Sequence, residues 1–174
     1  MARALDLGGL ERAAVRHLQR FPCSEDRLTF VLRRRIRRAE DLTEADRTAL
    51  EAGLPEIIVK MRRMGLVDDA AYARALVDSL HRRGKGRRAI AAKLRERMVP
   101  QAQAEAALAH LHEETADPEL EAALNYARRR RIGPFHRDPA RRAERRDKDL
   151  AALGRQGFSY GVARQVVDGD GDGD

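Results

Sequence analysis

The chain has 174 residues, of which 36% are charged and 4% aromatic, and its formal net charge is +7. So few aromatic residues exclude a thick aromatic core, no run approaches the ~20 apolar residues of a membrane span, and no signal peptide opens the chain. The charge is expected to attract polyanions, nucleic acid first, and the single cysteine, Cys23, suits a reducing cytoplasm, so we expect a cytoplasmic protein without membrane contact.

Helix-forming residues dominate the chain, and strand-forming residues are sparse, so we expect an all-α protein. Proline fits the first helical position and marks four helix starts, at Pro55, Pro100, Pro118 and Pro139. The Asp68-Asp69 pair and Ser159 are predicted to be further N-caps. With apolar residues spaced three and four apart, these marks predict helices over 8–20, 24–38, 44–51, 55–64, 69–82, 87–97, 101–113, 118–131, 139–155 and 159–167.

An internal repeat relates the middle of the chain to its end. The segment YARALVDSLHRRG, which begins at Tyr72, resembles YARRRRIGPFHRD, which begins at Tyr126. Downstream, the apolar positions between 94 and 108 recur 59 residues later. Each unit therefore consists of a long helix, a basic turn, a second helix, a short connection and a third helix.

The first part of the chain fits the same plan more loosely, with an insertion at about 39–53. A three-helix unit of this size is marginal alone, so neighbouring repeats are expected to pack together. We predict an elongated, curved array of three tandem three-helix repeats, at 8–66, 67–114 and 117–167, followed by a flexible acidic tail at 168–174. The aspartates of that tail resemble the opening of an EF-hand loop, but the loop's later Glu and second helix do not follow.

The turn RRGKGRRAI (82–90) raises the question of phosphate binding. It does not match a P-loop, because its glycines are too close, no Ser or Thr follows Lys85, and a helix precedes it. Gly84 can instead end that helix in the left-handed conformation. Lys85, Arg87 and Arg88 then stand at the start of the next helix, where cations and free N–H groups can hold a phosphate. A capping role and contact with a polyanion or acidic partner both stay open.

Other polar motifs point to structure rather than catalysis. Asp68 and Asp69 are interpreted as ionised caps of the helix that follows them, because no third acidic or His ligand accompanies them. The five histidines show no metal-ligand spacing; His110 and His112 are expected on different helix faces. The segment 128–146 is the densest basic region, and it is either a solvated face or a surface for phosphate and carboxylate groups. Few aromatic residues accompany it, so base stacking is not expected there.

The stretch MRRMGLVDDAAYARALVDSLHRRGKGRRAIAAKLRERMVP (61–100) resembles the central signature of the RecX family. That pattern combines a glycine, an apolar residue, paired aspartates, an aromatic-Ala step, a Lys-Gly turn and a helix with an Ile-to-Leu spacing. These places are taken by Gly65, Leu66, Asp68, Asp69, Tyr72, Ala73, Lys85, Gly86, Ile90 and Leu94. The pattern returns at 128–135 and 155–167, and the resemblance covers about 10–167. Near the start, RFPCS (20–24) replaces the family's usual Arg-Glu-Tyr/His-Ser stretch.

RecX-like proteins are tandem three-helix repeats that bind in the groove of the RecA filament on single-stranded DNA and inhibit it. The resemblance implies a monomeric regulator rather than an enzyme, without cofactor or metal, whose partners are RecA, the RecA–single-stranded DNA filament and, as an open question, DNA itself. The basic face expected to meet RecA or DNA comprises Arg82, Arg83, Lys85, Arg87, Arg88, Lys93, Arg128, Arg129, Arg130, Arg131, Arg142, Arg145 and Arg146.

Two other functions remain as alternatives. The first is a sequence-neutral nucleic-acid-binding protein without RecA specificity, which would share the salt dependence of a RecX-like regulator. The second is a nuclease, which the lack of a clustered carboxylate or His set disfavours. The resemblance does not decide between inhibition and stimulation of RecA, or between blocking the filament groove and capping its ends.

Overall fold

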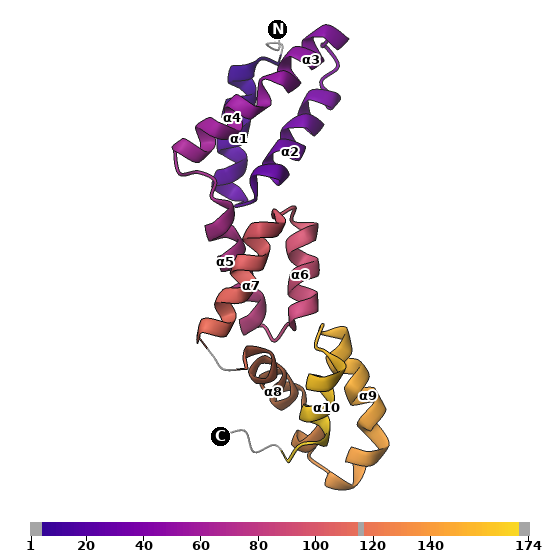
Figure 1. The fold of residues 1–174 in the computed structure, drawn as a ribbon. Coiled ribbons are helices and arrows are strands. Elements are labelled where there is room, and N and C mark those ends of the chain that lie inside the picture. The colour runs from indigo at the N-terminus through magenta and orange to yellow at the C-terminus, as the bar shows by residue number, and fades with distance from the viewer. Residues whose placement is uncertain (1–4, 115–116, 171–174) are drawn as a thin grey trace. The chain divides into compact units, whose positions relative to one another are not determined.

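The structure, a computed structural model, describes residues 5–114 and 117–170, without the side chains of 112–114. Every regular element in these ranges is helical, which confirms the all-α prediction (Figure 1). The elements are α1 (Leu7–Arg20), α2 (Glu25–Arg38), α3 (Glu44–Ala52), α4 (Leu54–Arg63), α5 (Asp69–Arg82), α6 (Arg87–Glu96), α7 (Gln101–Glu114), α8 (Pro118–Arg130), the 3-10 turns η1 (Gly133–Phe135) and η2 (Pro139–Arg141), α9 (Arg142–Arg155) and α10 (Tyr160–Asp168).

The predicted helices are present, and apart from α9 their ends differ from the prediction by no more than one residue. Side-chain caps explain several of the starts: Ser24 accepts a hydrogen bond from Arg27 N, and Ser159 accepts one from Val162 N, both at 3.2 Å. The helix predicted from Pro139 begins later. Asp138 accepts from Ala140 N, only two residues on, which tightens this segment into the turn η2 before α9 starts.

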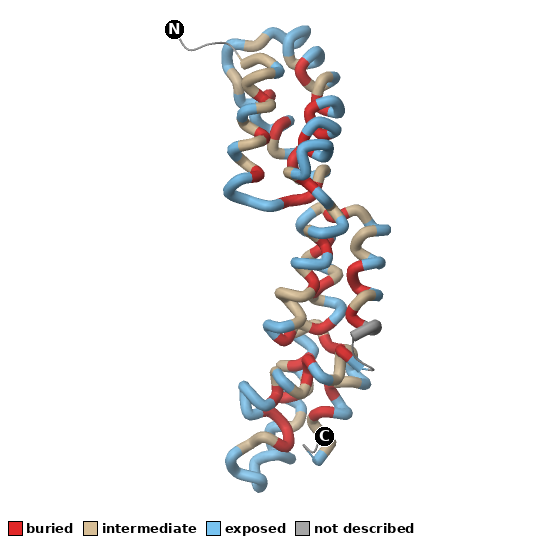
Figure 2. The backbone as a smooth tube through the Cα atoms, turned by 90° about the vertical axis from the view of Figure 1, so that its left-hand side faces the viewer, coloured by how far each residue is buried: buried red, intermediate tan, exposed pale blue. Residues whose placement is uncertain are grey.

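The chain divides into two compact units, Met1–Ala73 with Glu96–Gln103 (unit 1) and Arg74–Arg95 with Ala104–Asp174 (unit 2). Helices α5 and α7 each contribute residues to both units. Buried and exposed residues alternate along the helices in Figure 2, as expected when each helix buries one apolar stripe. The three repeat boundaries given above stay a prediction.

Unit 1 packs α1, α2, α3 and α4 around one apolar core, and α1, α2 and α4 lie side by side in Figure 1. On α2 the buried stripe consists of Leu28, Leu32 and Ile36, spaced by four residues, so one side of this helix faces the core and the other faces solvent. The buried core residues are Leu10, Ala14, Leu18, Cys23, Leu28, Leu32, Ile36, Leu50, Leu54, Ile57, Ile58, Met61 and Val67.

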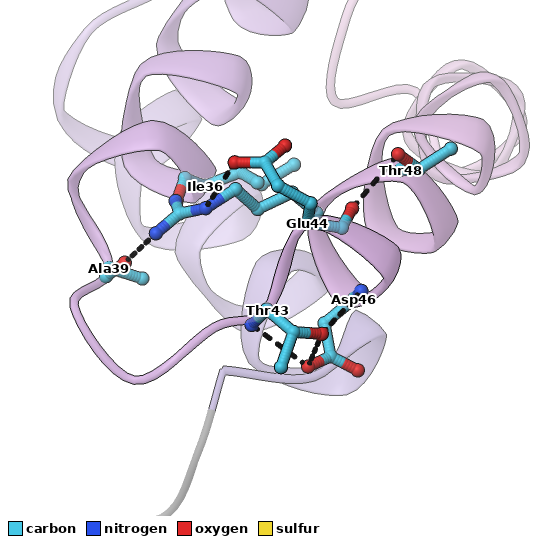
Figure 3. Close-up of polar contacts among 7 residues, drawn as sticks. Ile36, Ala39, Thr43, Glu44, Asp46 and Thr48 are labelled. Carbon is cyan, nitrogen blue, oxygen red and sulfur yellow. Dashed lines mark hydrogen bonds and ion pairs between the residues drawn. The ribbon is translucent and has the colours of Figure 1, made fainter.

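The predicted insertion forms α3 and a braced loop before it. Thr43 and Asp46 form a capping box: the Thr43 hydroxyl accepts from Asp46 N, and the Asp46 carboxylate accepts from Thr43 N (Figure 3). The guanidinium of Arg47 donates to Ile36 O and Ala39 O, both at 2.6 Å, and so satisfies carbonyls at the end of α2 (Figure 3). The loop that joins α2 to α3 is therefore held at both ends.

Unit 2 contains a second core, formed by α8, α9, α10 and η1. Asp149 of α9 is a buried carboxylate in this unit. Its Oδ2 accepts a hydrogen bond from Gly133 N at 2.9 Å and bonds His136 Nε2 at 2.6 Å. These bonds tie η1 to α9. The buried core residues are Ala122, Ala123, Ala127, Ile132, Leu153, Phe158, Ala163 and Val166, and α5, α6 and α7 add the buried residues Val77, Ile90, Leu94, Ala107 and Leu108 to the unit.

Candidate polyanion-binding surface

All thirteen residues of the predicted basic face belong to unit 2. The turn between α5 and α6 ends α5 as predicted, since Gly84 adopts φ +74° and Lys85 N donates to Leu80 O at 3.1 Å. This left-handed closure satisfies carbonyls at the end of the helix. The capping role of the turn is therefore confirmed.

Two N–H groups at the start of α6, those of Gly86 and Arg88, are occupied within the protein, so the prediction that the N–H groups here are free was wrong for these two. Gly86 N donates to Gln156 O at 2.9 Å and Arg88 N donates to Gly157 O at 3.2 Å. Lys85 Nζ also bonds Gln156 Oε1, at 2.8 Å. A Cβ on Gly86 would lie only 2.5 Å from the Gly157 carbonyl carbon. The turn between α9 and α10 thus takes the place that a phosphate would need.

The side chains of this turn divide into two groups. Lys85 and Arg87 serve the fold, because Arg87 Nη1 donates to Leu108 O at 3.4 Å while Lys85 bonds Gln156. The other three, those of Arg82, Arg83 and Arg88, are exposed and form no ion pair or hydrogen bond with the described residues. These three cations are available to a partner.

Helix α8 brings part of the second arginine group to the same turn. A Cβ added to Gly84 would lie 2.6 Å from Arg129 Nη2, so the Arg129 side chain passes directly over the turn. Arg130 and Arg131 are exposed at the end of α8, where Arg131 takes the left-handed conformation with φ +56°. Lys93, further along α6, is half-buried.

The remaining arginines surround η1 and α10. The Arg128 guanidinium lies 5.4 Å from the centre of the Phe135 ring, and Arg142 Nη2 donates to Pro134 O at 2.6 Å. Arg145 is exposed. Arg146 forms a two-pronged ion pair with Asp168, at 2.7 and 2.8 Å. The structure therefore brings Arg129 to the α5–α6 turn and Arg128 and Arg142 to η1. Arg146 is paired within the protein, with Asp168.

The Asp168 contact changes the interpretation of the acidic tail. Asp168, its first predicted residue, is the last residue of α10. The hydrogen bond and charge of Arg146 hold the pKa of Asp168 below its usual value, and Asp168 raises the pKa of Arg146. Residues 171–174 of the predicted tail lie outside the described residues.

The paired aspartates cap two different helices. Asp68 accepts from Ala71 N at 2.9 Å and caps α5, as predicted. Asp69 instead accepts from Glu25 N at 2.9 Å, at the start of α2, so its assignment to its own helix was wrong. Burial raises the pKa of Asp69 above its usual value. Among the residues that the structure describes, no group of three His, Cys, Asp or Glu side chains is arranged to hold a metal ion.

Sequence reasoning missed a second basic surface, on unit 1. Helix α2 carries six arginines, Arg27, Arg33, Arg34, Arg35, Arg37 and Arg38, most of them exposed. The signal was present in the segment RLTFVLRRRIRR, where arginines fill every position between the buried Leu32 and Ile36 and the two positions after Ile36. This helix lies in the part of the chain that fits the repeat pattern only loosely, so the pattern does not point to it.

Comparisons with known proteins identify relatives over most of the chain. The family model for the second three-helix domain of RecX matches residues 68–108. A regulatory protein RecX of Myxococcus xanthus (strain DK1622) is 38% identical over 159 residues, which cover 91% of this chain and 84% of that protein. A regulatory protein RecX of Agrobacterium fabrum is 32% identical over 163 residues, with 92% and 83% covered.

Solved structures share the fold. The crystal structure of RecX from Lactobacillus salivarius matches with a TM-score of 0.67 at 22% identity, over 93% of this chain and 94% of that one. Across 5–114 and 117–170, none of the helices combines the length and apolar composition that a membrane span requires. The sequence similarity extends over more than four fifths of each of the two relatives, and the chain therefore belongs to the RecX family of regulatory proteins.

Proposed function

We propose that this protein binds RecA and its filament on single-stranded DNA and inhibits the ATPase and recombinase activities of RecA, without making or breaking a bond itself. The observation that carries the proposal is membership of a family of regulatory proteins named RecX. The exposed cations Arg82, Arg83 and Arg88 support it, because they are not engaged within the described part of the chain and suit both phosphate and carboxylate groups.

The test is RecA ATPase activity on single-stranded DNA with the protein titrated in. We expect inhibition at ratios well below one molecule per RecA protomer. Changing Arg82, Arg83 and Arg88 to Gln should raise the half-inhibitory concentration by about tenfold, because three cations that meet a polyanion are removed. Lys85 and Arg87 are left unchanged because they hold the turn in place.

The matched control changes Arg137 and Arg155, two exposed arginines outside the predicted basic face, to Gln. Its half-inhibitory concentration should stay within about twofold of the starting protein, since the loss of general charge has only a weak effect. Full inhibition by the triple variant would remove the α5–α6 turn from the binding surface. Binding to DNA with no effect on RecA would favour the sequence-neutral DNA-binding alternative.

A further inference from the structure

An open hollow of about 640 Å³ lies beside α2 in unit 1. Its lining includes Phe30, Arg34, Arg35 and Arg38 of α2, and Ala39–Leu42 of the loop that follows. Phe30 is exposed over 38% of its surface, unusual for a phenylalanine next to an apolar core. The guanidinium of Arg27 lies 5.2 Å from the centre of its ring. The hollow thus combines an aromatic ring with four arginines, and Glu40 and Asp41 of the loop also line it.

These side chains share one side of α2 because of their spacing. Positions 27, 30, 34 and 38 recur at steps of three and four residues, the steps that place side chains above one another on a helix. Arg34 and Arg38 are four residues apart, about 6 Å along the axis, which is close to the separation of successive phosphates in an extended strand. Neither forms an ion pair or hydrogen bond with the described residues.

Besides α2, the hollow is lined by the loop 39–42, and hydrogen bonds hold both ends of this loop. Arg47 bonds Ile36 O and Ala39 O, and the capping box of Thr43 holds the start of α3 (Figure 3). Arg47 satisfies carbonyls at the end of α2, and the neighbouring Arg38 is exposed. The loop 39–42, which lines part of the hollow, is therefore held by hydrogen bonds at both of its ends.

A second hollow, of about 550 Å³, lies on the side of α2 that faces α1. It shares Val31 and Arg35 with the first hollow, so the two adjoin across α2. Arg20 and Phe21 line it, and Phe21 is 61% exposed. Arginines and the exposed rings of Phe21 and Phe30 therefore line two adjoining hollows, and we name the residues that line both hollows the α2 surface.

We propose that the α2 surface binds single-stranded DNA, with Arg34 and Arg38 on neighbouring phosphates and an unpaired base stacked on the Phe30 ring. A single strand presents both phosphates and bases, which fits a surface of arginines and exposed rings better than the uniformly acidic face of a protein. The choice of DNA as the nucleic acid rests on the function proposed above. The binding itself needs no RecA.

The test uses the full chain and a fluorescein-labelled oligo(dT) without RecA, with fluorescence anisotropy measured over a range of salt concentrations. Arg34→Gln with Arg38→Gln is expected to raise the Kd about tenfold and to reduce the salt slope by about 1.4, the value for two lost contacts to a single strand. The matched control is Arg33→Gln with Arg37→Gln, on the same helix, exposed, and lining neither hollow. It should raise the Kd less than about twofold.

A second pair of variants separates stacking from charge. Phe30→Leu should raise the Kd at least about fivefold, because a stacked base is lost, while the salt slope stays unchanged. Phe30→Tyr keeps the ring and should restore binding. Circular dichroism of each variant checks that the helices are retained.

Three outcomes would overturn the inference: no binding of oligo(dT), equal weakening by the test and control arginine pairs, or a Phe30→Leu variant that binds normally. If Arg34→Gln with Arg38→Gln binds oligo(dT) normally but fails to inhibit RecA, the surface meets protein instead of DNA. The RecA ATPase test judges the proposed function separately, because the wild-type protein can inhibit RecA whether or not the α2 surface binds DNA.

Discussion

Cys23 illustrates how burial can lower the reactivity of a thiol. The residue is 8% exposed in the unit 1 core, and burial raises the pKa of its thiol from 9.0 to about 11, although the charge of Arg27 works in the opposite direction. The thiolate is the form that reacts with alkylating reagents. Burial of the thiol and its raised pKa therefore both favour the less reactive, protonated form.

We therefore expect iodoacetamide to modify Cys23 at pH 8 about 100-fold more slowly in the folded protein than in denaturant, because the thiolate population falls about tenfold for each unit of pKa. Mass spectrometry of timed samples measures the rate. Equal rates in the two conditions would contradict the burial of this thiol.

Asp149 is a buried carboxylate that organises the turn η1. Its 4% exposed side chain accepts from Gly133 N and bonds His136. Asp149→Ala should lower the free energy of unfolding by roughly 2–3 kcal/mol, because the buried Gly133 N–H loses its charged acceptor. Asp149→Asn keeps an acceptor oxygen and should have a smaller effect. Urea unfolding followed by circular dichroism compares the two, and equal losses would show that charge alone matters.

At the scale of elements, the two glycines Gly86 and Gly154 provide a matched pair. A Cβ on Gly86 would lie 2.5 Å from backbone atoms of Gly157 and Phe158, whereas a Cβ on Gly154, within α9, meets nothing within 4 Å. Gly86→Ala should destabilise the protein by roughly 1–3 kcal/mol through overpacking. Gly154→Ala should stabilise it by up to about 1 kcal/mol through helix propensity. Thermal unfolding of both variants tests this, and a tolerated Gly86→Ala would contradict the close packing of the two turns.

The same elements show which features sequence can predict. Helix starts were found because their causes are local: a proline at the first position, or a capping Ser or Asp whose partner lies three residues away. The occupied N–H groups of α6 were missed because their acceptors, Gln156 and Gly157, lie about 70 residues away in the chain. Asp69 was misassigned for the same reason, since its partner is Glu25 N. Local chemistry is readable from the sequence, whereas long-range polar contacts need the structure.

The candidate sites were predictable to a similar extent. Charge and spacing indicated the arginines of the α5–α6 turn and of α8. Of the three cations predicted to stand open at this turn, Arg88 is exposed and makes no side-chain contact with the described residues, whereas Lys85 bonds Gln156 and Arg87, although exposed, bonds Leu108 O. The sequence did not reveal that Arg146 is held by Asp168, or that Phe30 is exposed on α2. Both depend on how helices pack side by side, which composition does not specify.

For the whole molecule, the distribution of charge matters more than its sum. Asp168 is bound to Arg146, and at 3.5 Å it also meets Arg164, so a single carboxylate masks part of the basic surface of unit 2. Folding lowers the pKa of Asp168 below its unfolded value of 3.8, so its ion pair stabilises the folded protein fully above that pH. This stabilisation is lost as the pH falls through the lower pKa of the folded state. The ion pair between Asp168 and Arg146 is therefore formed at neutral pH.

Asp168→Asn should release Arg146, and we expect the affinity for a polyanion to rise about two- to threefold with a steeper salt dependence, as one further cation becomes available. Asp170→Asn, an exposed neighbour with the same change in charge, is the control and should change the affinity less. Heparin retention and oligo(dT) anisotropy at several salt concentrations measure both. Equal gains by the two variants would mean that net charge alone acts.

The close contact between the turn at Gly86 and the turn at Gly157 also bears on the order in which the chain folds. The start of α6 has its backbone donors satisfied by a turn formed about 70 residues later, so this end of α6 is capped only after that turn is in place. A nascent chain that stops before α9 leaves these donors to water. We therefore expect α6 and the α9–α10 turn, which the repeat pattern assigns to separate modules, to unfold together within unit 2.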